Sequence, residues 1–225
     1  MYYKTKELRL DQTRQKDEEY ISSLYNEGFL FGRVERGYMY QTRSLRVDVS
    51  QFAPNSENRR IIRKHTENDL FSMRNEFLPI EKKNYDYSLH KRGKEFYRTK
   101  FPEEKFTAAK IKELLTREHN YNLLFSYLRD SNIVGNAICY SNSTCLHYCY
   151  PFYDLELDRS NFGMYMMIQA LLWAQMHGTN YVYLGGVTRA QDIYKLQFSG
   201  LEWFDGNSWN KDIASLKLIL RSEPS

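Results

Sequence analysis

The residues of this chain whose types and spacing suggest chemistry include a group of arginines. Arg59, Arg60 and Arg63 lie within two turns of an expected helix, so Arg59 and Arg63 share a face at i and i+4. Paired guanidinium groups bind phosphate or carboxylate in a bidentate manner. Three such groups on two turns are costly to place together without an anion. The spacing therefore predicts contact with phosphate or with an acidic partner.

A second group of candidate residues surrounds an apolar helix expected over 161–177. The first amides of a helix offer unpaired N–H groups and a partial positive charge to an anion. Asp154 ends the strand expected over 144–154, where its carboxylate either accepts a proton or caps a turn, and the residues alone favour neither role. Lys195, after Tyr194 on the short helix expected over 190–198, is by itself more typical of a surface lysine on an amphipathic helix.

The elements that must position these residues follow a recognisable order. A strand, a short charged loop, the apolar helix, a strand over 181–186 that runs into paired glycines, the short helix and a last strand over 201–204 follow one another. Strand, helix and strand in succession predict a parallel pair joined by a crossover. Strands over 123–130 and 133–140, joined at Ser131-Asn132, are expected to form a hairpin ahead of them. The order is that of an acyl-transferring α/β core.

The part of the chain before residue 121 is less regular. Helices are expected over 20–27, after Ser56 and over 107–119, and a strand or hairpin arm over 38–49. Residues 1–20 are highly charged and predict a peripheral helix or a frayed tail, while residues 78–102 show no clear period. We therefore divide the chain into an N-terminal strand and basic helical region over 1–120, packed on the core, and a core over 121–225.

Charge differs between these two parts. Residues 1–120 carry 25 Lys and Arg against 19 Asp and Glu, whereas residues 121–225 carry 7 against 9. A localised basic surface attracts polyanions, and the aromatic residues interspersed over 71–101 can stack on unpaired bases. A solvated surface over core aromatics is the alternative, which composition alone favours.

Composition and cysteine content indicate the compartment. The chain has 225 residues, of which 42% are hydrophobic, enough to bury a full core. Its longest apolar run is too short to span ~30 Å of hydrocarbon, and the first residues lack the apolar segment of a signal peptide. Cys145 and Cys149 flank His147 on one strand, a row in which we favour buried reduced thiols over a metal site. We expect a cytoplasmic protein.

Two sets of residues, in the same order, resemble a known family. The first set is Leu45–Val49 with Phe52, followed by Ser56–Lys64, and the second is Phe152-Tyr153-Asp154, Ser160–Tyr165, Tyr181–Gly185 and Tyr194-Lys195. They are similar to the strand, the Arg-Arg-x-x-Arg helix and the C-terminal catalytic domain of arginyl-tRNA–protein transferases, the aminoacyltransferases of the N-end rule. The resemblance implies an α/β fold with a GNAT-like acyltransferase core, in which helices flank a mixed central sheet.

The resemblance also implies a reaction, its partners and its site. An aminoacyl group, Arg or Leu, would pass from aminoacyl-tRNA to the N-terminal α-amine of a protein or peptide, without a cofactor, a metal or a membrane. The catalytic residues would be Asp154, Tyr194 and Lys195, with Asp154 at the amine and Lys195 at the tRNA phosphates or an acidic acceptor. The substrate-binding residues would be Arg59, Arg60, Arg63, Tyr153, Asn161, Gly163, Tyr183, Gly185 and Gly186.

Other donors and classes give two alternatives. An acyl-coenzyme A N-acyltransferase of the GNAT superfamily usually shows Gln/Arg-x-x-Gly-x-Gly/Ala at this helix, but aligned on Gly163 the chain has Ser160 and Tyr165 at the other two positions. We expect the Tyr165 ring to crowd a pyrophosphate. A non-catalytic RNA-binding relative is the other alternative. The family's cysteine cluster has no counterpart in residues 28–45, so no iron–sulfur or metal dependence is carried over.

Overall fold

The computed structural model describes residues 6–33, 35–67, 71–103 and 106–222, which fold into two compact units. The first unit comprises Met1–Asn55, Asn142–His147 and Trp173–Ser225, and the second comprises Ser56–Ser141 and Tyr148–Leu172. The chain therefore passes between the units several times. The division predicted at residue 120 lies inside the second unit, and it stays a prediction.

The first unit contains two sheets. Its elements are β1 (Glu7–Arg9), η1 (Arg14–Lys16), α1 (Glu18–Asn26), β2 (Phe29–Phe31), β3 (Tyr38–Gln41), β4 (Ser44–Asp48), η2 (Val49–Gln51), β9 (Tyr181–Gly186), η5 (Ala190–Gln197), β10 (Leu201–Phe204), β11 (Trp209–Asn210) and α6 (Ile213–Ser222). A small antiparallel sheet has the order β1-β3-β2. The second sheet runs β11-β10-β4-β9, and the first three residues of β8 (Cys145–Tyr153) pair with β9 in parallel. This parallel pair among antiparallel neighbours makes the sheet mixed.

A buried cation lies on the second of these sheets. Arg46 of β4 is 7% exposed, and its guanidinium bonds the Glu202 carboxylate at 2.8 Å. The same group lies 3.9 Å from the ring centroid of Tyr181 and 4.0 Å from that of Trp209. Because its hydrogen bonds and both faces are occupied by the protein, Arg46 serves the packing of this unit.

The second unit is built on a β-hairpin. Its elements are α2 (Ser56–Glu67), β5 (Phe71–Phe77), η3 (Lys82–Asn84), α3 (Ser88–Lys100), α4 (Ala108–Thr116), β6 (Leu123–Arg129), β7 (Asn132–Ser141), the rest of β8, η4 (Leu155–Ser160) and most of α5 (Phe162–Met176). Strand β6 pairs antiparallel with both β5 and β7. Asp130 and Ser131 turn the hairpin with φ of 49° and 70°, the left-handed pair that a tight two-residue turn requires.

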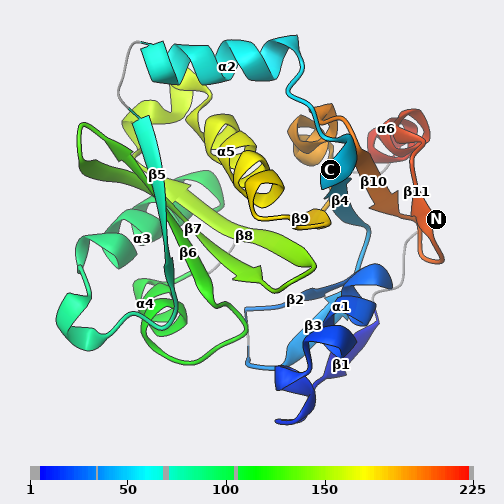
Figure 1. The fold of residues 1–225 in the computed structure, drawn as a ribbon, viewed down its shortest axis with the longest axis horizontal. Coiled ribbons are helices and arrows are strands. Elements are labelled where there is room, and N and C mark those ends of the chain that lie inside the picture. Colours follow the sequence, from blue (N-terminus) through cyan, green and yellow to red (C-terminus); the bar gives the residue numbers. More distant parts are fainter. Residues whose placement is uncertain (1–5, 34, 68–70, 104–105, 223–225) are drawn as a thin grey trace. The chain divides into compact units, whose positions relative to one another are not determined.

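Helices cover both faces of this hairpin (Figure 1). Asn136 of β7 bonds Arg92 of α3, while the neighbouring Gly135 faces α5, where an added Cβ would lie 3.0 Å from the Phe162 ring. Adjacent strand residues point to opposite faces, so α3 and α5 lie on opposite sides. Glycine at position 135 lets α5 approach this closely.

Several predictions from the sequence are confirmed. The α/β class with a mixed sheet flanked by helices is confirmed, as is the parallel pair of β8 and β9 across the α5 crossover. The hairpin of β6 and β7 is also confirmed, although its turn comes one residue earlier than expected. Thr107 caps α4 by accepting the backbone N–H of Lys110 at 3.2 Å.

One prediction is wrong, and one segment for which the sequence predicted no element is helical. Residues 78–102 include the 13-residue helix α3, whose buried stripe is interrupted by Arg92. Residues 7–9 form strand β1 against β3, in place of a helix or a frayed tail, while residues 1–5 lie outside the described part. The short helix expected over 190–198 is present as the 3₁₀ helix η5, and Asp192 in its first turn accepts the N–H groups of Thr188 and Arg189.

The cysteines are free thiols in the described structure. Cys139 and Cys145 are buried, but Cys149 is only half-buried, contrary to the prediction. Within the described residues, no three His, Cys, Asp or Glu side chains are close enough to hold a metal ion. No helix among these residues is long and apolar enough to cross a bilayer.

Candidate functional site

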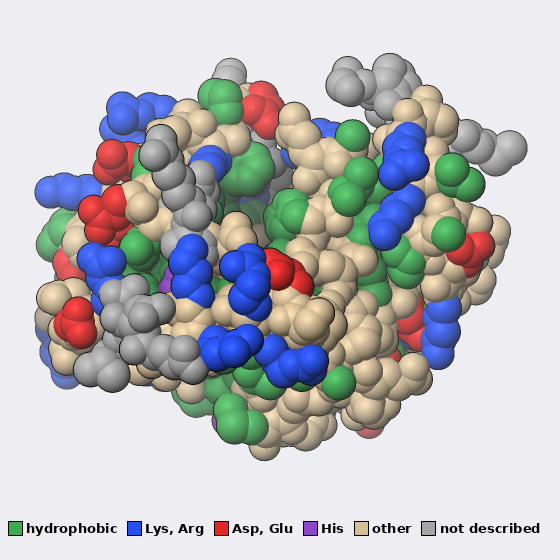
Figure 2. All heavy atoms as spheres, turned by 90° about the horizontal axis from the view of Figure 1, so that it is seen from above, with side chains coloured by type: hydrophobic (Ala, Val, Ile, Leu, Met, Phe, Trp, Pro, Cys, Tyr) green, Lys and Arg blue, Asp and Glu red, His purple; other side chains and the backbone are tan. Residues whose placement is uncertain are grey.

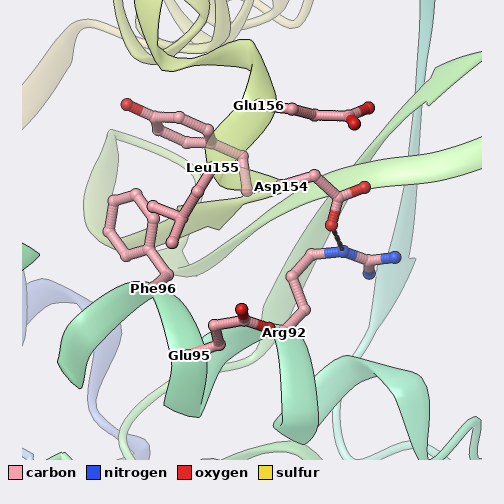
Figure 3. Close-up of a pocket in the computed structure, with 7 residues that line it drawn as sticks. Arg92, Glu95, Phe96, Asp154, Leu155 and Glu156 are labelled. Atoms are coloured by element: carbon pink, nitrogen blue, oxygen red, sulfur yellow. Dashed lines mark hydrogen bonds and ion pairs between the residues drawn. The ribbon is translucent and has the colours of Figure 1, made fainter. Parts of the chain in front are cut away.

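A pocket of about 310 Å³ opens in the second unit where β8 ends (Figure 3). Its lining comes from α3, from the last residue of β8 and from the start of η4. The lining residues are Arg92, Glu95, Phe96, Tyr153, Asp154, Leu155 and Glu156. The pocket therefore contains Tyr153 and Asp154, two of the predicted site residues.

Asp154 is held firmly at the edge of this pocket. Its backbone N–H donates to the Val134 carbonyl at 2.9 Å, and its carboxylate Oδ1 accepts from Arg92 Nε at 2.7 Å. Figure 3 shows the second carboxylate oxygen pointing away from Arg92, and the side chain is 36% exposed. This oxygen is free, among the described residues, to accept a proton from a bound group.

The rest of the lining suits an amine attached to an apolar group. The rings of Phe96 and Tyr153 lie 4.7 Å apart between centroids and form an apolar wall with Leu155. The lining carries three carboxylates and one guanidinium; that guanidinium is paired with Asp154, Arg129 outside the lining lies 3.4 Å from Glu156, and Glu95 adds a further negative charge. The excess of negative charge favours an ammonium or amine ligand over an anion.

The head of α5 lies beside this wall. Asn161 has a left-handed φ of 62°, and its carbonyl accepts the N–H groups of Met164 and Tyr165 at 3.1 Å each. A Cβ at Gly163 would lie 3.1 Å from Cε1 and 3.2 Å from the hydroxyl of Tyr153. The structure thus brings Gly163 and Asn161 into the neighbourhood of Tyr153. A larger residue at 163 would therefore make a tight contact with this ring.

The expectation for Tyr165 is wrong. Its side chain is 2% exposed and packs on Phe162 and His65 in the core of the unit, so its ring does not crowd a ligand. Burial raises the pKa of Tyr165 to about 12. The failed coenzyme A pattern at this position therefore reflects core packing and says nothing about the donor.

A second group of predicted residues lies in the first unit, around Lys195. Its ammonium donates to the Gly186 carbonyl at 3.0 Å and lies 3.3 Å from Asp192 Oδ1, with 14% of the side chain exposed. Lys195 is therefore not a surface lysine. It ties η5 to the end of β9, while the neighbouring Tyr194 is 48% exposed.

The other members of this group differ in accessibility. Tyr183 is 1% exposed and its hydroxyl donates to Asn26 Oδ1 at 3.4 Å; burial raises its pKa. Gly185 has a φ of 83° and open space where a Cβ would stand. Nearby His147 accepts or donates a bond with the Tyr25 hydroxyl at 2.9 Å, and burial lowers its pKa to about 3. His147 is therefore neutral at physiological pH.

The predicted arginines lie on α2 in the second unit. Arg59 and Arg63 are exposed, and Figure 2 shows Lys and Arg side chains gathered on the face to which α2 belongs. Arg60 makes two bonds to Glu57, at 2.7 and 2.6 Å. Contrary to the prediction, Arg60 therefore needs no external anion, because Glu57 balances its charge within the helix.

Sequence reasoning missed the α3 side of the pocket, namely Arg92, Glu95 and Phe96. The buried positions of this helix have helical spacing: they are Leu89, Gly93, Phe96 and Tyr97. Arg92 lies next to these buried positions, and a charged residue there indicates a buried partner of opposite charge. The long-range partner itself, Asp154, has no local signal.

A family model and the curated relatives indicate the same family. The family model described as "Arginine-tRNA-protein transferase, C terminus" matches residues 83–205. An aspartate/glutamate leucyltransferase of Chromohalobacter salexigens is 25% identical over 76% of this chain and 68% of its own length. One from Pseudomonas aeruginosa is 23% identical over 90% and 87%. The crystal structure of an aminoglycoside acetyltransferase from a soil metagenomic sample aligns with a TM-score of 0.38 at 14% identity, covering 69% of this chain and 91% of that one.

Proposed function

Because this chain belongs to the arginine-tRNA-protein transferase family, we propose that it transfers an aminoacyl group from tRNA to the N-terminal α-amine of a protein. The observation that carries the proposal is the pocket at the end of β8, which Asp154 lines together with an apolar wall of Phe96, Tyr153 and Leu155. An α-amine has an ordinary pKa of ~7.7–8.0 and is partly neutral near pH 7. The enzyme then has to orient this amine and accept one proton.

The reaction assigns a role to Asp154. The amine nitrogen attacks the carbonyl carbon of the aminoacyl ester, a C–N bond forms, and the C–O bond to the terminal ribose of the tRNA breaks. The nitrogen loses one proton, which Asp154 accepts through the oxygen that Arg92 leaves free. The ribose oxygen takes up a proton as it leaves. Tyr153 and Phe96 exclude water from one side of the amine.

We propose leucine as the transferred amino acid and proteins that begin with Asp or Glu as acceptors. The names of the two relatives support this choice. The apolar wall of Phe96, Tyr153 and Leu155 also suits a leucyl side chain. Glu95 and Glu156 attract the amine and repel an acidic side chain, so the acceptor's own carboxylate points away from this pocket. Such a modification belongs to the N-end rule and takes place in the cytoplasm, where charged tRNA is found.

The donor binds through its phosphates to α2. Arg59 and Arg63 are exposed on one face of this helix and supply two cations to the tRNA backbone. No cofactor enters the proposed reaction, because the ester bond of the donor is already activated. The packing of Tyr153 against Gly163 supports a donor without a pyrophosphate at the head of α5.

In the first unit, we propose that Lys195 acts by holding the end of β9. Its bond to the Gly186 carbonyl fixes the paired glycines, of which Gly185 offers an open backbone position. Tyr194, half exposed beside it, is then available to a substrate, whereas the buried Tyr183 supports the strand.

The test is transfer from defined donors. The protein is incubated separately with leucyl-tRNA, arginyl-tRNA and acetyl-coenzyme A, in each case with peptides that begin with Asp, Glu or Ala. The masses of the peptides are then measured by mass spectrometry. We expect one leucyl residue on the Asp and Glu peptides. Arginyl addition would overturn the choice of leucine. Acetyl addition, or no product from any charged tRNA, would overturn the proposed function.

A further inference from the structure

We infer that Arg92 is a positioning residue for the transfer reaction, acting through Asp154 and fixed in turn by Asn136. This inference rests on the proposed function of the Asp154 pocket. It assigns a role to a residue on α3, an element whose only other charged contribution to the pocket is the exposed Glu95.

Each nitrogen of the Arg92 guanidinium bonds a different acceptor. Nε donates to Asp154 Oδ1 at 2.7 Å, Nη1 to Asn136 Oδ1 at 3.2 Å and Nη2 to the Ile133 carbonyl at 2.6 Å. A guanidinium is planar, so three bonds to fixed acceptors determine both its position and its orientation. The orientation of Nε then determines which oxygen of Asp154 is occupied and which one is left for a ligand.

Asn136 is itself fixed from behind. Its side chain is buried in the middle of β7, and its Nδ2 donates to Ser126 Oγ on β6 at 3.0 Å. Because a guanidinium only donates, the amide must present its oxygen to Arg92 and its nitrogen to Ser126. The result is a series of hydrogen bonds that leads from Ser126 through Asn136 and Arg92 to Asp154.

The exposed fraction of the side chains decreases along this series of hydrogen bonds, away from the pocket. The Asp154 side chain is 36% exposed and that of Arg92 is 13% exposed, whereas Asn136 is fully buried. The carboxylate therefore meets the ligand while the cation lies behind it. Partly buried ion pairs add little stability over apolar packing of the same volume, so stability alone gives a weak reason for this arrangement. The need to hold a reacting carboxylate in place is a stronger reason for the arrangement, since a displacement of 1 Å can lower the rate about 100-fold.

The first experiment measures kcat and KM for leucyl transfer in variants of Arg92 and Asp154. Arg92→Lys keeps the charge but cannot reach three acceptors, so we expect kcat to fall by about 10- to 100-fold with little change in KM. Asn136→Ala should produce a smaller loss in the same direction. Arg98→Lys, a change at an exposed arginine of the same helix, is the matched control and should leave both constants unchanged.

The decisive comparison uses Asp154→Asn as the background. If Arg92 acts through Asp154, Arg92→Lys causes no further loss of kcat once Asp154 is replaced. Losses that multiply in the double variant would show that Arg92 meets the substrate directly, and they would overturn the inference. A wild-type protein that transfers no aminoacyl group would overturn the proposed function instead.

A second measurement does not depend on activity. The thermal unfolding midpoints of the wild type, Arg92→Lys, Asp154→Ala, which removes the acceptor of Arg92 Nε, and the double variant form a cycle. We expect the double variant to lose less than the sum of the two single losses, because one bond is removed twice. Additive losses would mean that Arg92 does not hold Asp154. Unlike the kinetic test, this result is informative even if the protein uses another donor.

Discussion

At the scale of single residues, the missing side chain at position 163 shapes the site. The Tyr153 side chain lies in tight contact with the position that a Cβ would take, with its nearest atoms 3.1 and 3.2 Å away. Tyr153 in turn forms the apolar wall of the pocket together with Phe96. The glycine therefore acts on the pocket through the position of this ring.

We predict that Gly163→Val lowers the free energy of unfolding by about 1–3 kcal/mol, because its two methyl groups overpack the space filled by the Tyr153 ring. Urea denaturation measures this loss. The same substitution in a Tyr153→Ala background should cost less, since the ring is gone. An equal cost in both backgrounds would locate the strain elsewhere.

Single residues differed in how far the sequence could predict them. Asp154 was identified from its place at a strand end and from a family motif, and it lines the pocket. Lys195 was identified in the same way, yet its ammonium is directed to the Gly186 carbonyl and Asp192. Whether a polar side chain faces a ligand or its own backbone depends on tertiary neighbours, which a motif does not encode.

At the scale of elements, helix α2 could be predicted from the sequence, whereas helix α3 could not. The sequence predicted α2 from Ser56 as an N-cap and from the family resemblance, but the internal pair of Arg60 and Glu57 became evident only from the side-chain geometry. Helix α3 was missed because charged residues interrupt its short apolar stripe. Helix α3 packs closely on α4: a Cβ added at Gly93 would lie 2.7 Å from Ile111. Such tertiary packing overrides weak local periodicity.

We predict that α2 binds the tRNA backbone through Arg59 and Arg63. Replacing both with Ala should weaken tRNA binding and reduce the slope of log affinity against log salt by about 0.7–0.9 per lost phosphate contact. Titrations at several salt concentrations measure this slope. Arg60→Ala is the internal control, because its guanidinium is already paired with Glu57, and it should change the slope less. An unchanged slope in the double variant would mean that Arg59 and Arg63 only form a solvated helix face and do not contact tRNA phosphates.

At the scale of the whole molecule, the order of elements predicted the α/β class, and the family model that matches residues 83–205 agrees with the resemblance seen in the motifs. The segments that make up each compact unit could not be predicted. Unit membership depends on contacts between residues far apart in the chain, such as Arg92 with Asp154. Local patterns do not report such contacts.

The most direct test of the account is the single-turnover rate of leucyl transfer by the wild type and by Asp154→Asn, at saturating peptide and leucyl-tRNA. Asparagine keeps the shape of the side chain and an oxygen for Arg92 Nε, but it cannot accept a proton. Proton acceptance by a positioned side chain contributes ~10²–10⁴-fold, so we predict a loss of that size. Equal rates in the two proteins would contradict a catalytic role for Asp154 and for the pocket at the end of β8.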